Sequence, residues 1–404
     1  MSATTLSYSP AGPLAGVKIL DLATAIAAPF ATSLLADQGA EVIKVESPGI
    51  GDILRYVGAS RNGVSAMFSM TNRNKRSLAL DLKSEAGLTI LKKLVANHDV
   101  LIHNFRPGVA ERLGIDYDSL KQVNAELIYV SVSGFGHVGP AAGKRAYDNV
   151  IQAYSGLAFN QANPETGEPV QNYQAIADKL TALTAAQAIP AALFARSQGQ
   201  GGQHIHLNMV DSVLHFLWMD AAGTASFLEP GANPGQQVAK GVKLIRFRNG
   251  WGQAAPLADS EFHGMCKAFG VDSRSDPRLA SVMDRMANRE AVEAVMAQVY
   301  EKAADMDVDI GVAAMEAEDV PCAKAMTLDE LPDDPQIQAN QSFVSYRHPV
   351  AGDLREPRAA AQFGQEPARI PVPCAALGAD TDEILNGLGM GAEIASLRAR
   401  GVVV

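Results

Sequence analysis

Cysteine is scarce in this chain, which has only three among its 404 residues. Cys266, Cys322 and Cys374 lie far apart, and none belongs to a C-x-x-C pair, so neither a zinc knuckle nor a disulfide framework is indicated. We expect three reduced, buried thiols and no metal site.

Positive charge and long apolar runs are also lacking. Lysine and arginine number 34 against 44 aspartate and glutamate residues, which gives a formal net charge of -10. This balance disfavours a nucleic-acid partner, because surfaces that bind DNA or RNA carry a basic excess. No apolar run reaches the roughly 18 residues that a membrane span needs. The start, MSATTLSYSPAGP, shows no signal-peptide pattern. We therefore expect a soluble cytoplasmic protein with no membrane partner.

The common hydrolase motifs are missing as well. The sequence contains no G-x-S-x-G, no H-E-x-x-H and no Walker loop, so a serine or metal hydrolase is not supported. What is present is the composition of a globular protein, 47% hydrophobic and 19% charged. The length suffices for two or three domains with a sizeable core.

Short apolar segments alternate with helical patterns through the first part of the chain. Helical spacing occurs at 29–37, from Ser84 onward and at 107–114, where Pro107 can take the first helical position and Gly114 ends the helix. The candidate strands cover residues 17–22, 41–46, 77–82, 99–103 and 126–131. This alternation predicts an α/β fold with a parallel sheet covered on both faces.

The remainder of the chain divides at a change of composition. Residues 175–196 predict a long helix and 204–209 a further strand. After residue 228 the segment EPGANPGQQ suggests a linker, and a smaller second domain with charged helices follows. A strand at 342–346 and a helix at 380–388 are expected in the tail.

Basic residues gather near several predicted strand and loop ends. The cluster Asn72-Arg73-Asn74-Lys75-Arg76 precedes a strand, and further positive charge comes from Lys83, Arg106, Arg112, Lys144 and Arg145. Each alone is best interpreted as part of a solvated surface. As a set in an acidic protein they indicate a local anion site suited to phosphate.

Two other patterns allow alternatives. Gly134-Phe-Gly136-His-Val-Gly139 matches G-x-G-x-x-G, but Pro140 and Gly143 follow where a dinucleotide site needs a helix. A flexible loop at a strand end is therefore the better interpretation, although a nicotinamide site stays open. His204 and His206 share one face of a strand, yet no third metal ligand is suggested, so packing or surface roles are favoured.

Asp178 lies near the start of the long predicted helix, in NYQAIADKLTALTAA. The helix dipole favours the ionised carboxylate there, and an ionised carboxylate can act as a nucleophile. From the residues alone, a simple first-turn acid explains it as well.

Several segments in order resemble the class III coenzyme A transferases. They are LAGVKILDL, ADQGAEVIKVE, NRNKRSLALDLKSEAG, NFRPGVAERLGIDY and GFGHVGP followed by AYDNVIQAYSGL, with DTDEILNGLGM near the end. The resemblance implies a Rossmann-like large domain over 1–225, a small α/β domain over 226–330, a return to the large domain over 331–404, and an interlocked homodimer.

The same resemblance implies a mechanism and its residues. Asp178 matches the nucleophilic aspartate, which would attack a donor thioester and carry coenzyme A as an aspartyl thioester to a small carboxylic acid. Backbone N–H groups at 134–139 could stabilise the developing oxyanions. Asp148 matches a second acidic residue near the active site. Coenzyme A is then a substrate, not a permanently bound cofactor. Its implied contacts are Ala27, Leu80, Lys83, Asn104, Phe105, Arg112 and Arg145.

The chain departs from the family pattern at a few positions. Ala177 stands where glycine is frequent before the nucleophile, Ile26 where some transferases have glutamine, and Ser47 where some have arginine. Related racemases have a histidine where this chain has Tyr147. Since a tyrosine is a poor base at neutral pH, transferase is favoured over racemase, the alternative function. A non-catalytic CoA-binding protein is a weaker third alternative.

Overall fold

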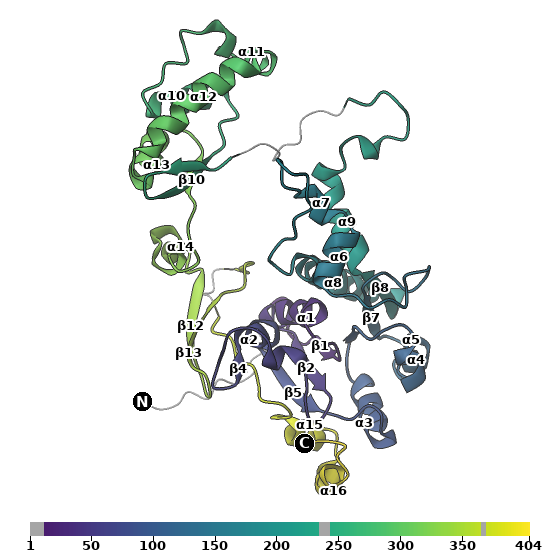
Figure 1. Ribbon diagram of the computed structural model, residues 1–404. Helices are drawn as coiled ribbons and strands as arrows, with labels where there is room; N and C mark the ends of the chain where they lie inside the picture. The colour runs from purple at the N-terminus through teal and green to yellow at the C-terminus, as the bar shows by residue number, and fades with distance from the viewer. Residues whose placement is uncertain (1–11, 234–242, 365–368) are drawn as a thin grey trace. The chain divides into compact units, whose positions relative to one another are not determined.

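The computed structural model describes residues 12–233, 243–364 and 369–404 (Figure 1). The chain forms two compact units, one of Met1–Pro234 with Gln341–Val404 and one of Gly235–Asn340. Whether these units behave as the predicted domains stays a prediction.

The first unit is built on a six-stranded parallel sheet in the order β5-β2-β1-β6-β7-β8. The predicted parallel sheet is thus confirmed, with β5 and β7 displaced by about two residues from their predicted bounds. The strands are β1 (Lys18–Asp21), β2 (Glu41–Glu46), β5 (Lys75–Ala79), β6 (Val100–His103), β7 (Ile128–Ser133) and β8 (Gln203–Asn208).

Both faces of this sheet are covered because its strands are apolar on both sides. In β6, for example, Leu101 belongs to one buried cluster, while Val100 and Ile102 belong to another. The helices α1 (Ala27–Asp37) and α8 (Ile176–Ala195) pack on the second face. The first face is covered by α3 (Glu85–Val95), α15 (Thr381–Gly387) and α16 (Ile394–Ala399).

The C-terminal segment therefore belongs to the core of the first unit. Leu385 and Leu397 are buried beside strand residues, and Val403 forms a bridge with Leu80 after β5. In Figure 1 the yellow C-terminal helices lie next to the purple strands that begin the chain. The predicted helix at 380–388 is confirmed.

Local signals account for several helix ends. Ser84 accepts a hydrogen bond from the Gly87 N–H at 3.0 Å and caps α3, while left-handed Gly114 ends α4 (Val109–Leu113). The expectation that Pro107 opens this helix is wrong. The helix begins only after Gly108, whose left-handed φ of 82° is not helical, so Pro107 lies outside the helix.

Shorter elements complete the first unit. The hairpins β3 (Ser60–Arg61) with β4 (Val64–Ser65) and β12 (Phe343–His348) with β13 (Gly352–Pro357) are antiparallel. The others are η1 (Ile53–Tyr56), α2 (Ala66–Asn72), α5 (Tyr117–Lys121), α6 (Asp148–Tyr154), α7 (Leu157–Asn160), η2 (Arg196–Gln200), α9 (Met209–Ala221) and η3 (Gly223–Ser226).

The second unit has its own sheet and its own apolar core. Its antiparallel strands run in the order β11-β10-β9, and residues such as Phe247, Cys266 and Val299 fill the core. The elements are β9 (Ile245–Phe247), β10 (Gly250–Ala254), α10 (Asp259–Ala268), η4 (Pro277–Leu279), α11 (Val282–Ala287), α12 (Arg289–Ala304), α13 (Val308–Glu316), β11 (Cys322–Lys324), η5 (Leu331–Asp333) and α14 (Pro335–Ala339).

Two further sequence expectations concern thiols and membranes. All three cysteines are free, and Cys266 and Cys374 are buried, but Cys322 is only half-buried, contrary to the expectation for it. Across the described ranges, no helix is long and apolar enough to cross a membrane.

Candidate active site

The strand order reverses between β1 and β6, and ligands of open parallel sheets bind at the carboxyl ends of strands at such a point. The loop after β1 and the loop after β6 are tied together there. The Thr24 N–H donates to Asn104 Oδ1 at 3.0 Å, and Asn104 Nδ2 donates to the Thr24 carbonyl at 2.7 Å. This edge of the sheet is the starting point for the candidate site.

Asp178 lies in the first turn of α8, which packs along α1. The Ala27 backbone N–H at the start of α1 lies close enough to this carboxyl group to lower its pKa. Its own N–H donates to Asp148 Oδ1 at 3.0 Å. Gln152 holds the other oxygen of Asp148 at 2.5 Å. Asp178, Asp148 and Ala27, three of the predicted site residues, are therefore brought together.

The electrostatics of Asp178 differ from the sequence expectation. Burial, followed by the neighbouring charge of Asp148, raises the pKa of Asp178 to about 7, and the nearby Ala27 N–H opposes this rise only in part. Burial thus opposes the ionised form that the helix dipole was expected to favour at this position. A carboxylate near neutral pKa is a stronger base and nucleophile than an ordinary aspartate.

The residues on either side of these carboxylates take ordinary conformations. Ala177 is fully buried inside α8, so the position needs no glycine-specific turn. Tyr147 precedes α6 and is 72% exposed. Its phenol is therefore not held in the buried environment that surrounds Asp178.

The remaining predicted coenzyme A contacts differ in accessibility. Phe105 is half-buried and stacks on His103 with 4.9 Å between ring centroids. The Leu80 side chain is buried in the core, and its N–H donates to the Glu46 carbonyl. By contrast, the side chains of Lys83, Arg112 and Arg145 are exposed.

The prediction that the basic cluster at 72–76 contributes to an anion site is wrong for its three cationic residues. Arg73 is buried between Asp37 and Glu356, at 2.6 and 3.3 Å. Lys75 is buried against Asp21 at 2.9 Å, and Arg76 pairs with Glu383 at 3.0 Å. These cations are neutralised within the protein and do not form an exposed phosphate site.

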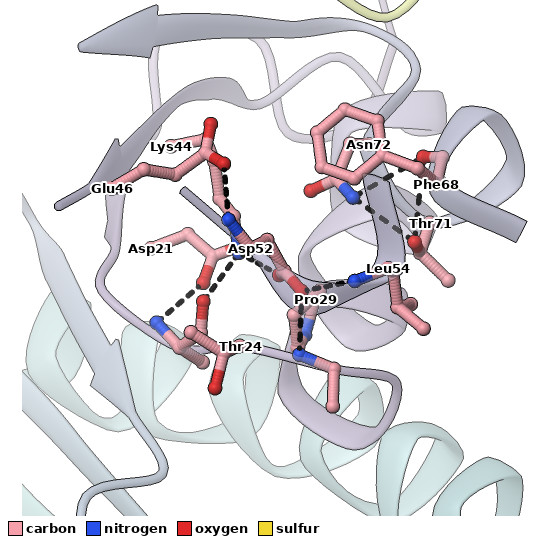
Figure 2. Close-up of polar contacts among 12 residues, drawn as sticks. Asp21, Thr24, Pro29, Lys44, Glu46, Asp52, Leu54, Phe68, Thr71 and Asn72 are labelled. Atoms are coloured by element: carbon pink, nitrogen blue, oxygen red, sulfur yellow. Dashed lines mark hydrogen bonds and ion pairs between the residues drawn. The ribbon is translucent and has the colours of Figure 1, made fainter. Parts of the chain in front are cut away.

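Sequence reasoning missed a buried ionic cluster beneath the loop after β1 (Figure 2). It contains Asp21, Lys44, Glu46, Asp52 and Lys75, all buried. A signal was available, because Asp21, Lys44, Glu46 and Lys75 lie in strands covered on both faces, where a charge must be buried and paired.

The histidines on β8 form a stacked row. His206 stacks on His137 with 4.1 Å between ring centroids, and the His204 ring lies tilted beside it at 3.7 Å. Ser131 Oγ lies 2.9 Å from His204 Nε2. Burial, and then the neighbouring imidazoles, lower the pKa of His204 to about 4. Among the described residues no group of three or more histidine, cysteine or acidic side chains is arranged to hold a metal ion.

The glycine motif after β7 does not open a helix. The Gly136 N–H donates to Ser133 Oγ at 3.1 Å, and the next helix, α6, begins only at Asp148. The helix that a dinucleotide site requires directly after the glycines is therefore missing from residues 134–147, which the structure describes in full.

Comparison with known proteins decides the family. The model of CoA-transferase family III matches residues 14–381. The chain belongs to CoA-transferase family III. It is an enzyme that transfers coenzyme A between acyl-CoA and carboxylic acids, as a class III CoA-transferase.

Relatives and solved structures agree over most of the chain. An acetyl-CoA:oxalate CoA-transferase of Acetobacter aceti is 35% identical over 305 residues, covering 74% of this chain and 77% of the relative. A succinate–glutarate CoA-transferase of Agrobacterium fabrum is 31% identical, covering 93% of this chain and 96% of the relative. The crystal structure of a CAIB/BAIF family protein from Brucella suis superimposes with a TM-score of 0.80 at 30% identity, covering 93% of this chain and 99% of that one.

Proposed function

We propose that Asp178 is the nucleophile of this transferase and carries coenzyme A as a covalent aspartyl thioester. The observation that supports this most directly is the environment of its carboxylate. It lies beside the Ala27 amide at the strand-order reversal, with a pKa raised to about 7.

The proposed reaction has four steps. The Asp178 carboxylate attacks the carbonyl carbon of the donor thioester and expels CoA thiolate, which leaves a mixed anhydride. The thiolate attacks the aspartyl carbonyl and releases the donor acid, which forms the aspartyl thioester. The acceptor carboxylate then attacks that thioester and expels the thiolate again. The thiolate finally attacks the acceptor carbonyl of the new anhydride and regenerates Asp178.

Asp148 has two proposed roles in this scheme. By accepting the Asp178 N–H at 3.0 Å it fixes the first turn of α8. Its negative charge also opposes the charge on Asp178, which makes the nucleophile more basic. The carboxamide of Gln152, anchored on the carbonyls of Asn172 and Gln174, holds Asp148 in place.

The exposed cations supply the proposed grip on coenzyme A. Lys83, Arg112 and Arg145 would meet its phosphates, since guanidinium and ammonium groups are the usual phosphate ligands. Phe105 would flank the cofactor, and Ala27, Leu80 and Asn104 would contact it through backbone or amide groups. Coenzyme A enters and leaves as part of the substrates, with no permanently bound cofactor.

The acid partners are proposed to be small carboxylic acids. The names of the two relatives pair acetyl-CoA with oxalate and succinate with glutarate. Short dicarboxylates and their thioesters are therefore the first substrates to try, with products followed by mass spectrometry.

A homodimer is also proposed. The helices α8 and α9 expose large apolar side chains, among them Phe194, Phe216 and Met219. Apolar surface of this kind is typical of a protein interface. Light scattering at low protein concentration should give twice the mass of one chain, and a stable, active monomer would rule the dimer out.

Chemical trapping tests the nucleophile. The enzyme is incubated with a reactive acyl-CoA donor, treated with hydroxylamine, and digested for mass spectrometry. We expect a hydroxamate on Asp178. Asp211 is a matched control, because it is also a first-turn carboxylate of a helix in the same unit but is exposed. Modification of Asp211 alone, or full activity in Asp178→Ala, would reject the proposal.

A further inference from the structure

The loop after β1 rests on buried charges that come from three neighbouring strands and the segment after β2. Lys44 of β2 donates to the Ala23 carbonyl and pairs with Asp52 at 3.0 Å. Asp21 of β1 accepts from Thr32 at 2.7 Å and from Lys75 of β5 at 2.9 Å. Figure 2 shows Asp21, Lys44 and Asp52 grouped close to Thr24.

Four successive backbone amides of this loop have fixed partners. The Leu22 N–H donates to the Ile102 carbonyl, Ala23 to Asp21, Thr24 to Asn104, and Ala25 to Asp52, at 2.9 to 3.1 Å. The chain is thus held residue by residue from the end of β1 to the start of α1.

The last of these contacts is made under backbone strain. Ala25 has a φ of 65°, in the left-handed region that residues with a Cβ avoid. Asp52 Oδ1 holds this conformation by accepting both the Ala25 and the Leu54 N–H, at 3.1 and 2.9 Å. Two residues later, the Ala27 N–H meets the Asp178 carboxylate.

We propose that Asp52 and Lys44 are positioning residues for catalysis, which hold the strained Ala25 so that the Ala27 amide faces Asp178. This inference rests on the proposed role of Asp178 as nucleophile. Lys44 fixes Asp52 by charge and clamps the Ala23 carbonyl, so neither residue needs to touch substrate. Without the pair, Ala25 relaxes and the Ala27 amide shifts away from the nucleophile.

The buried ionic cluster suits this task because its positive and negative charges balance and are shielded from water. Glu46 accepts the Asp52 N–H at 2.9 Å and is itself paired with Arg55 at 2.7 Å. The side chains of both ion pairs are nearly or completely shielded from water. Electrostatic contacts are stronger in such a dry environment than in water. A loop held in this way resists displacement better than one held by exposed contacts.

The test measures how fast Asp178 is acylated in a single turnover. Asp52→Ala and Lys44→Met are compared with wild type in the full chain, with hydroxylamine trapping and mass spectrometry as the readout. We expect acylation to slow by roughly 10- to 100-fold, the loss typical of a misplaced reacting group. We expect the KM for the acyl-CoA donor to change by less than about threefold, since ground-state binding is not affected.

The pH profile separates positioning from general damage. The Asp148 carboxylate of α6 is the charge that faces Asp178, and it is unchanged in these variants. Displacement of the Ala27 N–H from Asp178 should therefore raise the pKa of this carboxyl group and move the midpoint of the acylation profile to higher pH. Glu356→Gln is the matched control, because it also removes a carboxylate paired with a buried cation, Arg73. Glu356→Gln should change the acylation rate by less than about threefold and the midpoint by only about a few tenths of a pH unit.

A second variant keeps the inference testable if a single substitution prevents folding. The double change Lys44→Met with Asp52→Leu replaces the buried ion pair by apolar groups, which proteins often tolerate. It still removes the acceptor of the Ala25 N–H. If the folded double variant acylates Asp178 at the wild-type rate with an unchanged midpoint, the positioning role is wrong. If wild type is not modified at Asp178, the proposed nucleophile is wrong instead.

Discussion

The loops that follow β1 and β7 leave the same edge of the sheet but are built differently. The first, residues 22–26, is short, and each backbone amide from Leu22 to Ala25 has a fixed partner. The second, residues 134–147, is longer and largely exposed, and its cations Lys144 and Arg145 have no carboxylate partner among the described residues. A Cβ on Gly134 would lie 2.2 Å from that of Ala146, so only the two ends of this loop are packed together.

The difference fits two separate tasks that we propose for these loops. Covalent chemistry requires atoms that hold their positions, and the β1 loop delivers one amide to Asp178 from a buried, charge-balanced base. Binding a large anionic substrate requires charge that water and ligand can reach, and the β7 loop offers that charge without internal neutralisation. Substitutions in the two loops should therefore affect different kinetic constants.

The largest effect is expected at Asp178, the proposed nucleophile near the first loop. Asp178→Ala should lower kcat for CoA transfer by at least about 10³-fold, because the covalent route is lost. The KM for acyl-CoA should change little. Steady-state kinetics with thioester products resolved by chromatography measures both values. If Asp178→Ala kept more than about one tenth of the wild-type rate of CoA transfer, another group would have to act as the nucleophile.

Ionisation of Asp178 gives the second prediction. Only the carboxylate attacks, so acylation should rise with pH through about 7 and level off above. Asp148→Asn should move this midpoint to lower pH, because a neighbouring negative charge is removed. It should also slow the plateau rate, since a less basic carboxylate is a weaker nucleophile. A midpoint that stays fixed in Asp148→Asn would remove Asp148 from this role.

The same raised pKa predicts a stability change of known sign. Between its ordinary pKa and about 7, the folded protein keeps a proton on Asp178 that the unfolded chain has lost. Stability from this group is thus present at low pH and lost as pH rises through 7. Asp178→Asn should then raise the free energy of unfolding at pH 8 by on the order of 2 kcal/mol, and not at pH 4. Denaturant melts at the two pH values test this.

The contrast between the loops also shows how far sequence reasoning reached. The parallel sheet, the cap at Ser84 and the long helix were predictable, because apolar spacing and capping residues act locally. The roles of Asp178 and Asp148 were predicted only from the family resemblance. The sequence around an acidic residue in the first turn of a helix does not show whether its side chain is exposed or buried. The buried cluster was missed because pairs such as Asp21 with Lys75 join residues far apart in the chain, and a basic run such as 72–76 does not reveal its distant partners.

Substitution in the open loop should have a moderate effect of another kind. Arg145→Gln with Lys144→Gln should raise the KM for acyl-CoA several-fold, on the order of 1 kcal/mol of binding, while kcat stays within about twofold. Added salt should narrow the difference from wild type, because exposed charges are screened. Lys93→Gln is the control, as this exposed lysine lies at the end of α3, near the amino ends of the strands. An equal effect in the control would exclude a specific phosphate contact.

The smallest effect is expected at Tyr147, the last residue of the loop after β7. A racemase must exchange the alpha proton of its substrate with solvent, which requires an acid and a base beside that carbon. Tyr147 is 72% exposed, and a tyrosine side chain is a poor base at neutral pH. Tyr147→Phe should therefore keep CoA transfer within about twofold of wild type. Both enzymes should also release a 2-methylacyl thioester without deuterium when the reaction is run in heavy water with a free acid acceptor, as followed by proton NMR. Rapid alpha-deuteration without acyl exchange would show that the carbon–hydrogen bond is broken, a step that transfer through Asp178 does not contain.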